Sequence, residues 1–290
     1  LYRFVVNTLC GKIWRKRMNE FTLMVMILMI AIIIGLFIMR SNLKMPIRHI
    51  PSSFGQSMTI GDREVQEDNL GKLTAKEGTL LVLADGMGKK YGGKIASRIA
   101  VDTFIDLFKE YKAFEKPQYY FRKAFNAANR IILNKLDGRG SSSVAAAVII
   151  NDTLYYALVG NIKIAVFRNG DLVPVSEGHT IDILAKQKYQ KGLITKEYAL
   201  KLLEHHRLYN FVGQDGFHEI EFFSQPLPLR KGDIVALMSD GVYDTLSWRE
   251  IESELSVRSD AQSKALKIIE RVNLSKKPNK DNASIVLYRI

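Results

Sequence analysis

Acidic residues recur at four points where the sequence predicts the start or the end of a β-strand. They are Glu67-Asp68 after a polar stretch, Asp85 after the apolar run 80–84, Asp240 after 234–238, and Asp281 before 283–288. Converging carboxylates repel one another and resist burial unless a positive charge gathers them. A divalent metal site is therefore the simplest explanation of the pattern.

The residue types in this pattern indicate which metal and which chemistry to expect. Oxygen ligands without cysteine or patterned histidine favour Mg²⁺ or Mn²⁺ over zinc. Two such ions about 3.5–4 Å apart activate a shared water for attack on phosphorus. Arg63, in the expected turn 61–63, carries a planar fork that suits two phosphate oxygens, although a lone arginine is more often a solvated surface residue. The pattern predicts a metal-dependent phosphoester hydrolase.

The elements that must position these residues follow an α+β order. Helical periodicity marks 92–108, 117–136, 181–189, 195–205, 247–256 and 260–272. Strand patterns mark 143–150, 153–160, 164–168, 218–224 and 233–239, besides the runs named above. Two-residue turns between neighbouring strands indicate antiparallel hairpins, and the helix pairs predict a layered α+β domain. The polar helical segment 180–215 is expected to form a mobile flap over a site.

Composition favours a folded chain and argues against nucleic-acid binding. The 290 residues are 47% hydrophobic and 10% aromatic, which is sufficient for a packed core. The net charge is +12, but the first 50 residues hold eight Lys and Arg against one Glu, so most of the excess flanks one segment. Nucleic acid is therefore not an expected partner.

The flanked segment is residues 21–39, which contain no charged side chain. A helix of this length spans about 28 Å, which matches the hydrocarbon core of a bilayer. Residues 40–44 offer no small-residue cleavage site, so an uncleaved single-pass anchor is favoured over a signal peptide. We expect a basic segment at 1–20, a transmembrane helix at 21–39, a juxtamembrane linker at 40–56 and the main domain at 57–290.

Charge leaves both membrane orientations open. The basic residues before the segment outnumber those after it, which alone would place the domain outside. Translation from Met18 would instead leave Arg40, Lys44 and Arg48 to hold the domain in the cytoplasm. The single Cys10 excludes an internal disulfide and is compatible with a reducing compartment. The expected location is the cell membrane, with the domain in the cytoplasm.

Taken in order, the motifs resemble the bacterial form of the metal-dependent Ser/Thr protein phosphatases of type 2C, the PPM family. They are Arg63, Gln66-Glu67-Asp68-Asn69, Asp85-Gly86-Met87-Gly88, Gly93, Ala96-Ser97, Gly140-Ser141-Ser142-Ser143, Val159-Gly160, Ser239-Asp240-Gly241 and Asp281-Asn282. Each motif is weak alone, but their order and intervals fit together over about 57–290. The resemblance implies an αββα sandwich of two antiparallel sheets flanked by helix pairs, with the flap at about 176–215.

The resemblance also implies a role for each site residue. Asp85 would bridge two Mn²⁺ or Mg²⁺ ions. Asp240 and Asp281 would complete the coordination of the first ion, and Glu67 and the Gly86 carbonyl would coordinate the second. Asp68 would bind through water, and Arg63 would bind the phosphate. Met87 stands where animal members place a histidine as general acid. The implied reaction is hydrolysis by water activated between the two metals, without a covalent phosphoenzyme.

The sequence departs from the family pattern at two places. Asn161 stands where the family carries an aspartate of a third metal site, so third-metal affinity and turnover are expected to fall. Lys89-Lys90 adds positive charge to the glycine-rich turn and would favour acidic phosphosubstrates, while a solvated loop is an equally good interpretation.

These observations lead to one main hypothesis and two alternatives. The main hypothesis is a membrane-anchored phosphatase that acts on phosphoserine and phosphothreonine in proteins and opposes a Ser/Thr kinase. The first alternative is a catalytically weak or inactive regulatory module on the same fold. Asn161 favours this alternative, whereas the retained carboxylates of Glu67, Asp85, Asp240 and Asp281 argue against it. A small-molecule phosphatase or diesterase that uses the same metals is the other alternative.

Overall fold

The computed structural model describes residues 24–26, 28–35, 53–110, 113, 115–203, 207–217 and 219–290. Residues 24–26 and 28–35 are helical, and Pro51–Ile290 forms a compact unit distinct from Leu1–Ile50. Across the part of the chain that the structure describes, no helix combines the length and the apolar content needed to span a bilayer. The predicted anchor at 21–39 falls partly outside the described residues and stays a prediction.

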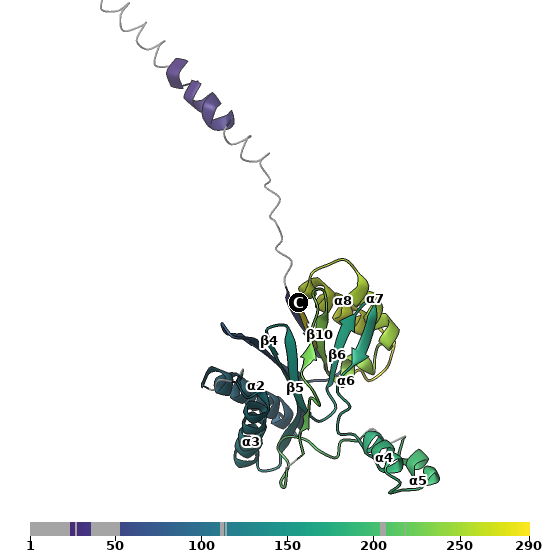
Figure 1. Ribbon diagram of the computed structural model, residues 1–290. Coiled ribbons are helices and arrows are strands. Elements are labelled where there is room, and N and C mark those ends of the chain that lie inside the picture. Colours follow the sequence, from purple (N-terminus) through teal and green to yellow (C-terminus); the bar gives the residue numbers. More distant parts are fainter. Residues whose placement is uncertain are drawn as a thin grey trace, which may run out of the picture. The chain divides into compact units, whose positions relative to one another are not determined.

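Two antiparallel sheets form the centre of the compact unit (Figure 1). The first sheet has the order β1 (Phe54–Thr59), β11 (Ala283–Arg289), β10 (Ile234–Met238), β6 (Lys163–Arg168) and β7 (Asp171–Pro174). The second has the order β2 (Asn69–Thr74), β3 (Thr79–Gly88), β4 (Gly140–Ile150), β5 (Thr153–Val159) and β8 (Glu221–Phe222), and β9 (Leu227–Pro228) also pairs with β5. The expected α+β architecture of two antiparallel sheets is confirmed.

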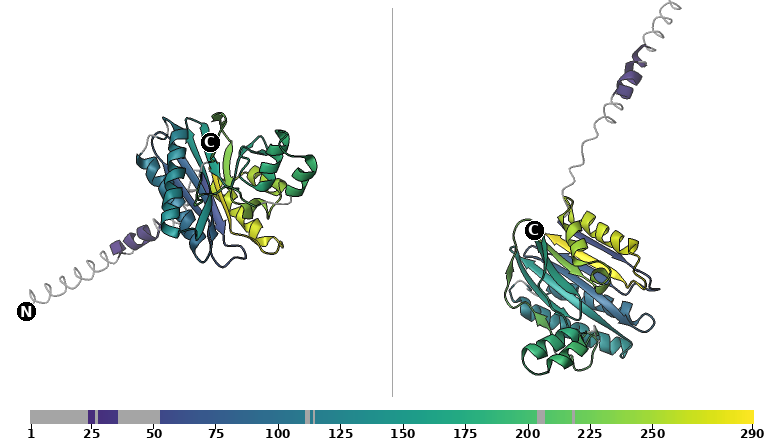
Figure 2. Two further views of the ribbon diagram at one scale, coloured as in Figure 1. Left: turned by 90° about the horizontal axis from the view of Figure 1, so that it is seen from below. Right: turned by 90° about the vertical axis from the view of Figure 1, so that its right-hand side faces the viewer.

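Helices cover the two sheets, as the two views of Figure 2 show. Helices α2 (Gly92–Glu110) and α3 (Pro117–Leu136) lie on the second sheet, where α2 contacts β2, β3 and β4. Helix α8 (Ala261–Leu274) packs on β1 and β11 of the first sheet, next to α7 (Trp248–Ser256) and α6 (Asp240–Tyr243). The pair α4 (Ile181–Gln190) and α5 (Lys196–Leu202) extends away from the sheets (Figure 1).

The position of the core explains the unbroken apolar runs in the sequence. In β10, Val235 and Leu237 pack into the core shared with the second sheet, whereas Ala236 and Met238 pack into the core beneath α7 and α8. Both faces of the strand are therefore buried, and no polar alternation is needed.

One strand end differs from the expectation. The sequence predicts a turn at Asp85, but β3 continues to Gly88, and Asp85 pairs with Ser143 inside the β3–β4 ladder. The strand passes so close to the start of α2 that a Cβ on Gly86 would lie 2.1 Å from the Gly93 carbonyl oxygen. Glycine at position 86 therefore allows the close approach that keeps Asp85 within a strand rather than at a turn.

The flap region also contains less regular structure than expected. The helix predicted at 195–205 is Lys196–Leu202, and His205 and His206 lie outside the described residues. The strand predicted at 218–224 is reduced to Glu221–Phe222. These two residues pair with the short section Ala157–Leu158 of β5, which limits the length of the ladder.

Candidate active site

A cleft of about 780 Å³ opens at one end of the sandwich, where segments next to strands of both sheets meet. The predicted site residues that line it are Arg63, Glu67, Asp85, Gly86, Asn161, Asp240 and Asp281. Asp68 is buried close to them, with 6% of its surface exposed. The fold thus brings together side chains that are up to 218 positions apart in the sequence.

Asp85 lies on β3, which the neighbouring strand holds in place. The Ser142 hydroxyl on β4 donates to the Asp85 carbonyl oxygen at 2.8 Å. The next residue, Gly86, donates its N–H to the Glu67 carbonyl oxygen at 3.2 Å. The Ser97 hydroxyl on α2 donates to that same oxygen at 2.5 Å. These contacts connect the segment carrying Glu67 to β3 and α2.

The Ser239 hydroxyl connects Asp68 and the start of α6 to strand β11 through two hydrogen bonds. Ser239, the residue before helix α6, donates its hydroxyl to Asp68 Oδ2 at 2.9 Å. The same hydroxyl accepts the Ser284 backbone N–H at 2.9 Å. Asp240 follows directly as the first residue of the four-residue helix α6.

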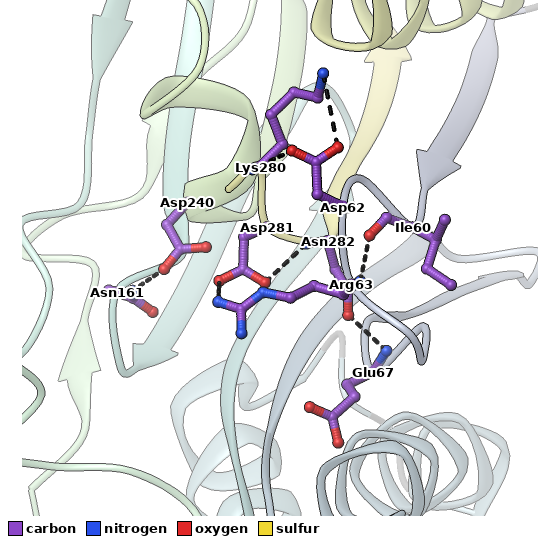
Figure 3. Close-up of polar contacts among 9 residues, drawn as sticks. All are labelled: Ile60, Asp62, Arg63, Glu67, Asn161, Asp240, Lys280, Asp281 and Asn282. Atoms are coloured by element: carbon purple, nitrogen blue, oxygen red, sulfur yellow. Dashed lines mark hydrogen bonds and ion pairs between the residues drawn. The ribbon is translucent and has the colours of Figure 1, made fainter. Parts of the chain in front are cut away.

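Asn282 connects the two acidic segments at the other side of the cleft. Its side-chain oxygen accepts the Glu67 backbone N–H at 2.7 Å, and its Nδ2 donates to the Ile60 carbonyl oxygen at 2.8 Å. Figure 3 shows these contacts beside Asp281, whose Oδ1 accepts the Asn282 backbone N–H at 2.8 Å. One amide side chain thus sets the distance between Glu67 and Asp281.

Arg63 points into the cleft and pairs with Asp281. The distance from Arg63 Nη2 to Asp281 Oδ2 is 2.7 Å, and both side chains remain about half exposed (Figure 3). The turn carrying Arg63 is held by reciprocal bonds, because the Asp62 N–H donates to the Lys280 carbonyl and the Lys280 N–H donates to Asp62 Oδ2, each at 2.9 Å. The guanidinium is therefore positioned by its backbone while its remaining donors face the cleft.

Asn161 makes four hydrogen bonds with described residues, one of them from its backbone N–H to the Ser143 hydroxyl oxygen at 3.4 Å. Its Nδ2 donates to Asp240 Oδ2 at 2.8 Å (Figure 3). Its Oδ1 accepts the Ser143 hydroxyl at 2.8 Å. Its carbonyl oxygen accepts the Tyr243 hydroxyl at 2.8 Å. An aspartate at this position would place a second negative charge against Asp240, so the amide replaces a repulsive contact with an attractive one.

Burial and mutual repulsion raise the pKa values of the carboxyl groups in the cleft. Burial is the main cause and, with the charge of Asp281, raises the pKa of Asp240 to about 7 and that of Asp68 to about 6. Burial, followed by the charges of Asp240 and Asp68, raises the pKa of Asp85 well above its usual range. Burial also raises the pKa of Glu67. Each ionised carboxylate here is costly unless a cation compensates it.

This donor set fits Mg²⁺ or Mn²⁺. Glu67 Oε1 and Asp68 Oδ1 are buried and accept no hydrogen bond from the described residues, and a hard divalent cation satisfies such oxygens. No three carboxylate, histidine or cysteine side chains among the described residues are already grouped as a metal site. Arg63 holds Asp281 and the Asn161 amide holds Asp240 in the arrangement described above. The metal-ligand roles therefore stay predictions.

Three functional positions were not assigned a role from the sequence. Asn282 and Ser143 occur within the quoted motifs, but their hydrogen bonds depend on partners far away in the chain. Arg207, at the base of the α4–α5 segment, lines the cleft and lies outside every motif. A single arginine in a polar segment gives no sequence signal, so only the fold reveals its place.

The sequence resembles a known protein family and individual known proteins. The family description "Protein phosphatase 2C" matches residues 56–267. The serine/threonine phosphatase stp of Listeria welshimeri is 28% identical over 235 residues, covering 78% of this chain and 90% of that protein.

Solved structures share the fold. The serine/threonine phosphatase of S. agalactiae superposes with a TM-score of 0.69 at 23% identity, over 82% of this chain and 99% of that one. The catalytic domain of the serine/threonine protein phosphatase PstP, in complex with 2 manganese ions, superposes with a TM-score of 0.61 at 22% identity, over 81% of this chain and 96% of that one.

Proposed function

Because the chain belongs to the protein phosphatase 2C family, we propose that it is a metal-dependent phosphatase that hydrolyses phosphoserine and phosphothreonine in proteins. The observation that carries this proposal is the cleft itself, which combines partly buried, mutually repelling carboxylates with the guanidinium of Arg63. The related stp phosphatase of Listeria welshimeri, whose sequence aligns over most of both chains, supports the same reaction class.

The carboxylates of this chain would hold the metal. Glu67, Asp85, Asp240 and Asp281 face the cleft as ligands, and the buried Asp68 supports them. When bound, Mn²⁺ or Mg²⁺ would lower the pKa of the attacking water and compensate the negative charge on the phosphoryl oxygens. The manganese complex of the PstP catalytic domain supports a site for two ions in this chain.

Arg63 would bind the phosphate of the substrate. Its Nη2 is engaged by Asp281, while its side chain is 58% exposed in the cleft, so a phosphate can exchange with or add to that carboxylate as its partner. Met87 also lines the cleft, and its thioether cannot donate a proton. The leaving serine or threonine oxygen therefore takes its proton from water in the cleft.

The experiment that tests this function compares the chain with its Asp85→Asn variant. Asparagine keeps the shape of the side chain but removes the charge, and the buried position gains from that removal because burial disfavours the carboxylate. We expect Mn²⁺-dependent release of phosphate from a phosphothreonine peptide by the unaltered chain, loss of that release in the variant, and an unchanged or raised melting temperature. Equal activity of both proteins would contradict the function proposed for this cleft.

A second candidate function is a weakly active or inactive module that binds phosphoproteins. The observation that favours it is the hydrogen bond from Asn161 to Asp240, which engages an oxygen that a metal ligand would use. Retention of the phosphothreonine peptide without release of phosphate, in the presence of Mn²⁺, would support this candidate. Release of phosphate would exclude an inactive module.

We further propose that the chain is anchored in the cell membrane through residues 21–39 and that its domain faces the cytoplasm, where it opposes a Ser/Thr kinase. The uncharged segment and its basic flanks support the membrane anchor, and the single Cys10 is compatible with a reducing compartment. Recovery of the chain in the membrane fraction, resistant to high salt and released by detergent, is the expected result. Recovery in the supernatant would contradict anchoring, and an external domain in a reporter-fusion assay would contradict the cytoplasmic role.

A further inference from the structure

The cleft contains two cations in addition to Arg63. Lys90 lies in the loop between β3 and α2, and Arg207 lies at the base of the α4–α5 segment. Neither forms an ion pair with another described residue. Two exposed cations from separate parts of the chain therefore line the same cleft as the partly buried carboxylates.

The backbone of Lys90 adopts a conformation that is unfavourable for lysine. Its φ is +58°, a left-handed conformation that glycine adopts more readily than lysine. The loop around it is fixed, because the Lys89 N–H donates to the Arg139 carbonyl at 3.1 Å and the Gly92 N–H donates to the Lys89 carbonyl at 3.0 Å. Lys90 lines the cleft, whereas its neighbour Lys89 does not, although both side chains are exposed.

The backbone of Arg207 is also held in place. Its carbonyl oxygen accepts the Ile181 N–H at 2.9 Å, and Leu208 next to it forms a β-bridge with Thr180. Leu208 and Phe211 line the cleft beside it, so this wall is apolar with a cationic edge. Such a surface suits a peptide more than a free phosphate, which has no apolar part.

The other charged residues of the cleft wall do not cancel these cations. Asp62 forms an ion pair with Lys280, with 3.8 Å between Lys280 Nζ and Asp62 Oδ1. Among the described lining residues outside the metal-ligand set, Glu64 is then the remaining carboxylate, against the three cations Arg63, Lys90 and Arg207. The wall formed by these residues is therefore net positive, while the negative charge of the cleft belongs to the carboxylates of the metal-ligand set.

We propose that Lys90 and Arg207 bind aspartate or glutamate side chains that flank the phosphorylated residue, so that the enzyme prefers acidic phosphopeptides. This inference rests on the phosphatase function proposed above. A cleft of about 780 Å³ has room for more than one residue of an extended chain, whose residues advance by about 3.3 Å each. Neighbouring side chains of the substrate therefore reach Lys90 and Arg207 while the phosphate faces the metal-ligand carboxylates.

The test uses two phosphothreonine peptides that differ only in their flanking residues, Asp and Glu in one and Asn and Gln in the other. For the full chain with Mn²⁺ we expect kcat/KM to be about tenfold higher for the acidic peptide, with each cation contributing about threefold. Lys90→Gln and Arg207→Gln should each lower this ratio, and the double variant should bring it close to one. The preference should also decline as ionic strength rises.

Lys89→Gln is the matched control, because it removes the same charge one residue outside the cleft and should leave the ratio unchanged. Melting temperatures of all variants should agree with that of the unaltered chain. Equal hydrolysis of both peptides by the unaltered chain, or an unchanged ratio in the double variant, would overturn this inference while leaving the phosphatase function intact. Hydrolysis of neither peptide would instead overturn the phosphatase function.

Discussion

At the scale of single residues, Asn161 shows how one atom changes the electrostatics of a site. Its Nδ2 donates to Asp240, where an aspartate would present a repelling oxygen. The amide therefore stabilises Asp240 without any cation and makes the cleft less dependent on metal for its stability.

Asn161→Asp reverses this balance. Two carboxylates at hydrogen-bond distance repel, so we expect the metal-free variant to lose about 1–3 kcal/mol of unfolding free energy. Mn²⁺ should restore stability, so that its addition raises the melting temperature of the variant more than that of the unaltered chain. The same Mn²⁺-induced rise in both proteins would show that residue 161 does not influence metal binding. Asn161→Ala, which removes the donor without adding charge, is the control.

Arg63 illustrates a residue whose contribution concerns binding more than folding. Its ion pair with Asp281 is about half exposed, and such pairs contribute about 0–1 kcal/mol to stability. Arg63→Lys keeps the charge but loses the planar fork, so we expect KM for a phosphothreonine peptide to rise about tenfold with little change in melting temperature. A KM equal to that of the unaltered chain would show that Arg63 does not bind the phosphate.

At the scale of elements, the site depends on the close contact between β3 and the start of α2. Gly86→Ala would place a Cβ 2.1 Å from the backbone oxygen of Gly93, and backbone cannot yield as a side chain does. We expect a loss of about 1–3 kcal/mol in stability together with loss of activity. Gly71→Ala on β2 is the matched control, because the atoms nearest to its Cβ, at 2.6 Å and 2.9 Å, belong to the side chains of Val101 and Ile105 rather than to the backbone. Full activity of Gly86→Ala would contradict the role assigned to this contact.

The β5–β6 turn depends on a buried histidine. The His179 side-chain Nδ1 accepts the Gly160 backbone N–H at 3.0 Å, and the Gly160 carbonyl oxygen accepts the His179 backbone N–H at 2.7 Å. Burial lowers the pKa of His179 from 6.5 to about 4, so the imidazole is neutral in the folded chain. This contact connects the base of the flap to the turn that carries Asn161.

The His179 pKa shift predicts a defined pH dependence of stability. The unfolded chain binds the proton on His179 more tightly than the folded chain does. The stability that the neutral imidazole contributes is therefore complete above pH 6.5 and is lost as the pH falls to about 4. The loss amounts to about 3 kcal/mol across that window. In metal-free denaturant titrations, the stability difference between the unaltered chain and His179→Gln should shrink from pH 7.5 to pH 4.5. A difference that is constant with pH would contradict the buried neutral histidine.

At the scale of the whole molecule, the sequence predicts the layers better than the details of the cleft. The apolar runs of β3, β10 and β11 are easy to recognise, because a sheet on one side and helices on the other bury both faces. Short pairings such as β8 contain too few residues for a periodic pattern. The strand through Asp85 was predicted to end too early, because two glycines there serve close packing rather than a turn.

The carboxylates of the site were predictable, whereas their partners were not. Asp85, Asp240 and Asp281 stand next to apolar runs, which makes their convergence foreseeable from the sequence. Arg207 and the amide bonds of Asn161 and Asn282 depend on contacts between distant segments, and local patterns contain no information about them.

We propose that this cleft performs metal-dependent hydrolysis of phosphoproteins. The most direct test strips the full chain of metal with a chelator and then measures phosphate release from a phosphothreonine peptide as Mn²⁺ is added back. We expect no release without metal, a saturable rise with Mn²⁺, and no rise in Asp85→Asn. Release that is independent of Mn²⁺, or a saturable rise that persists in Asp85→Asn, would contradict it.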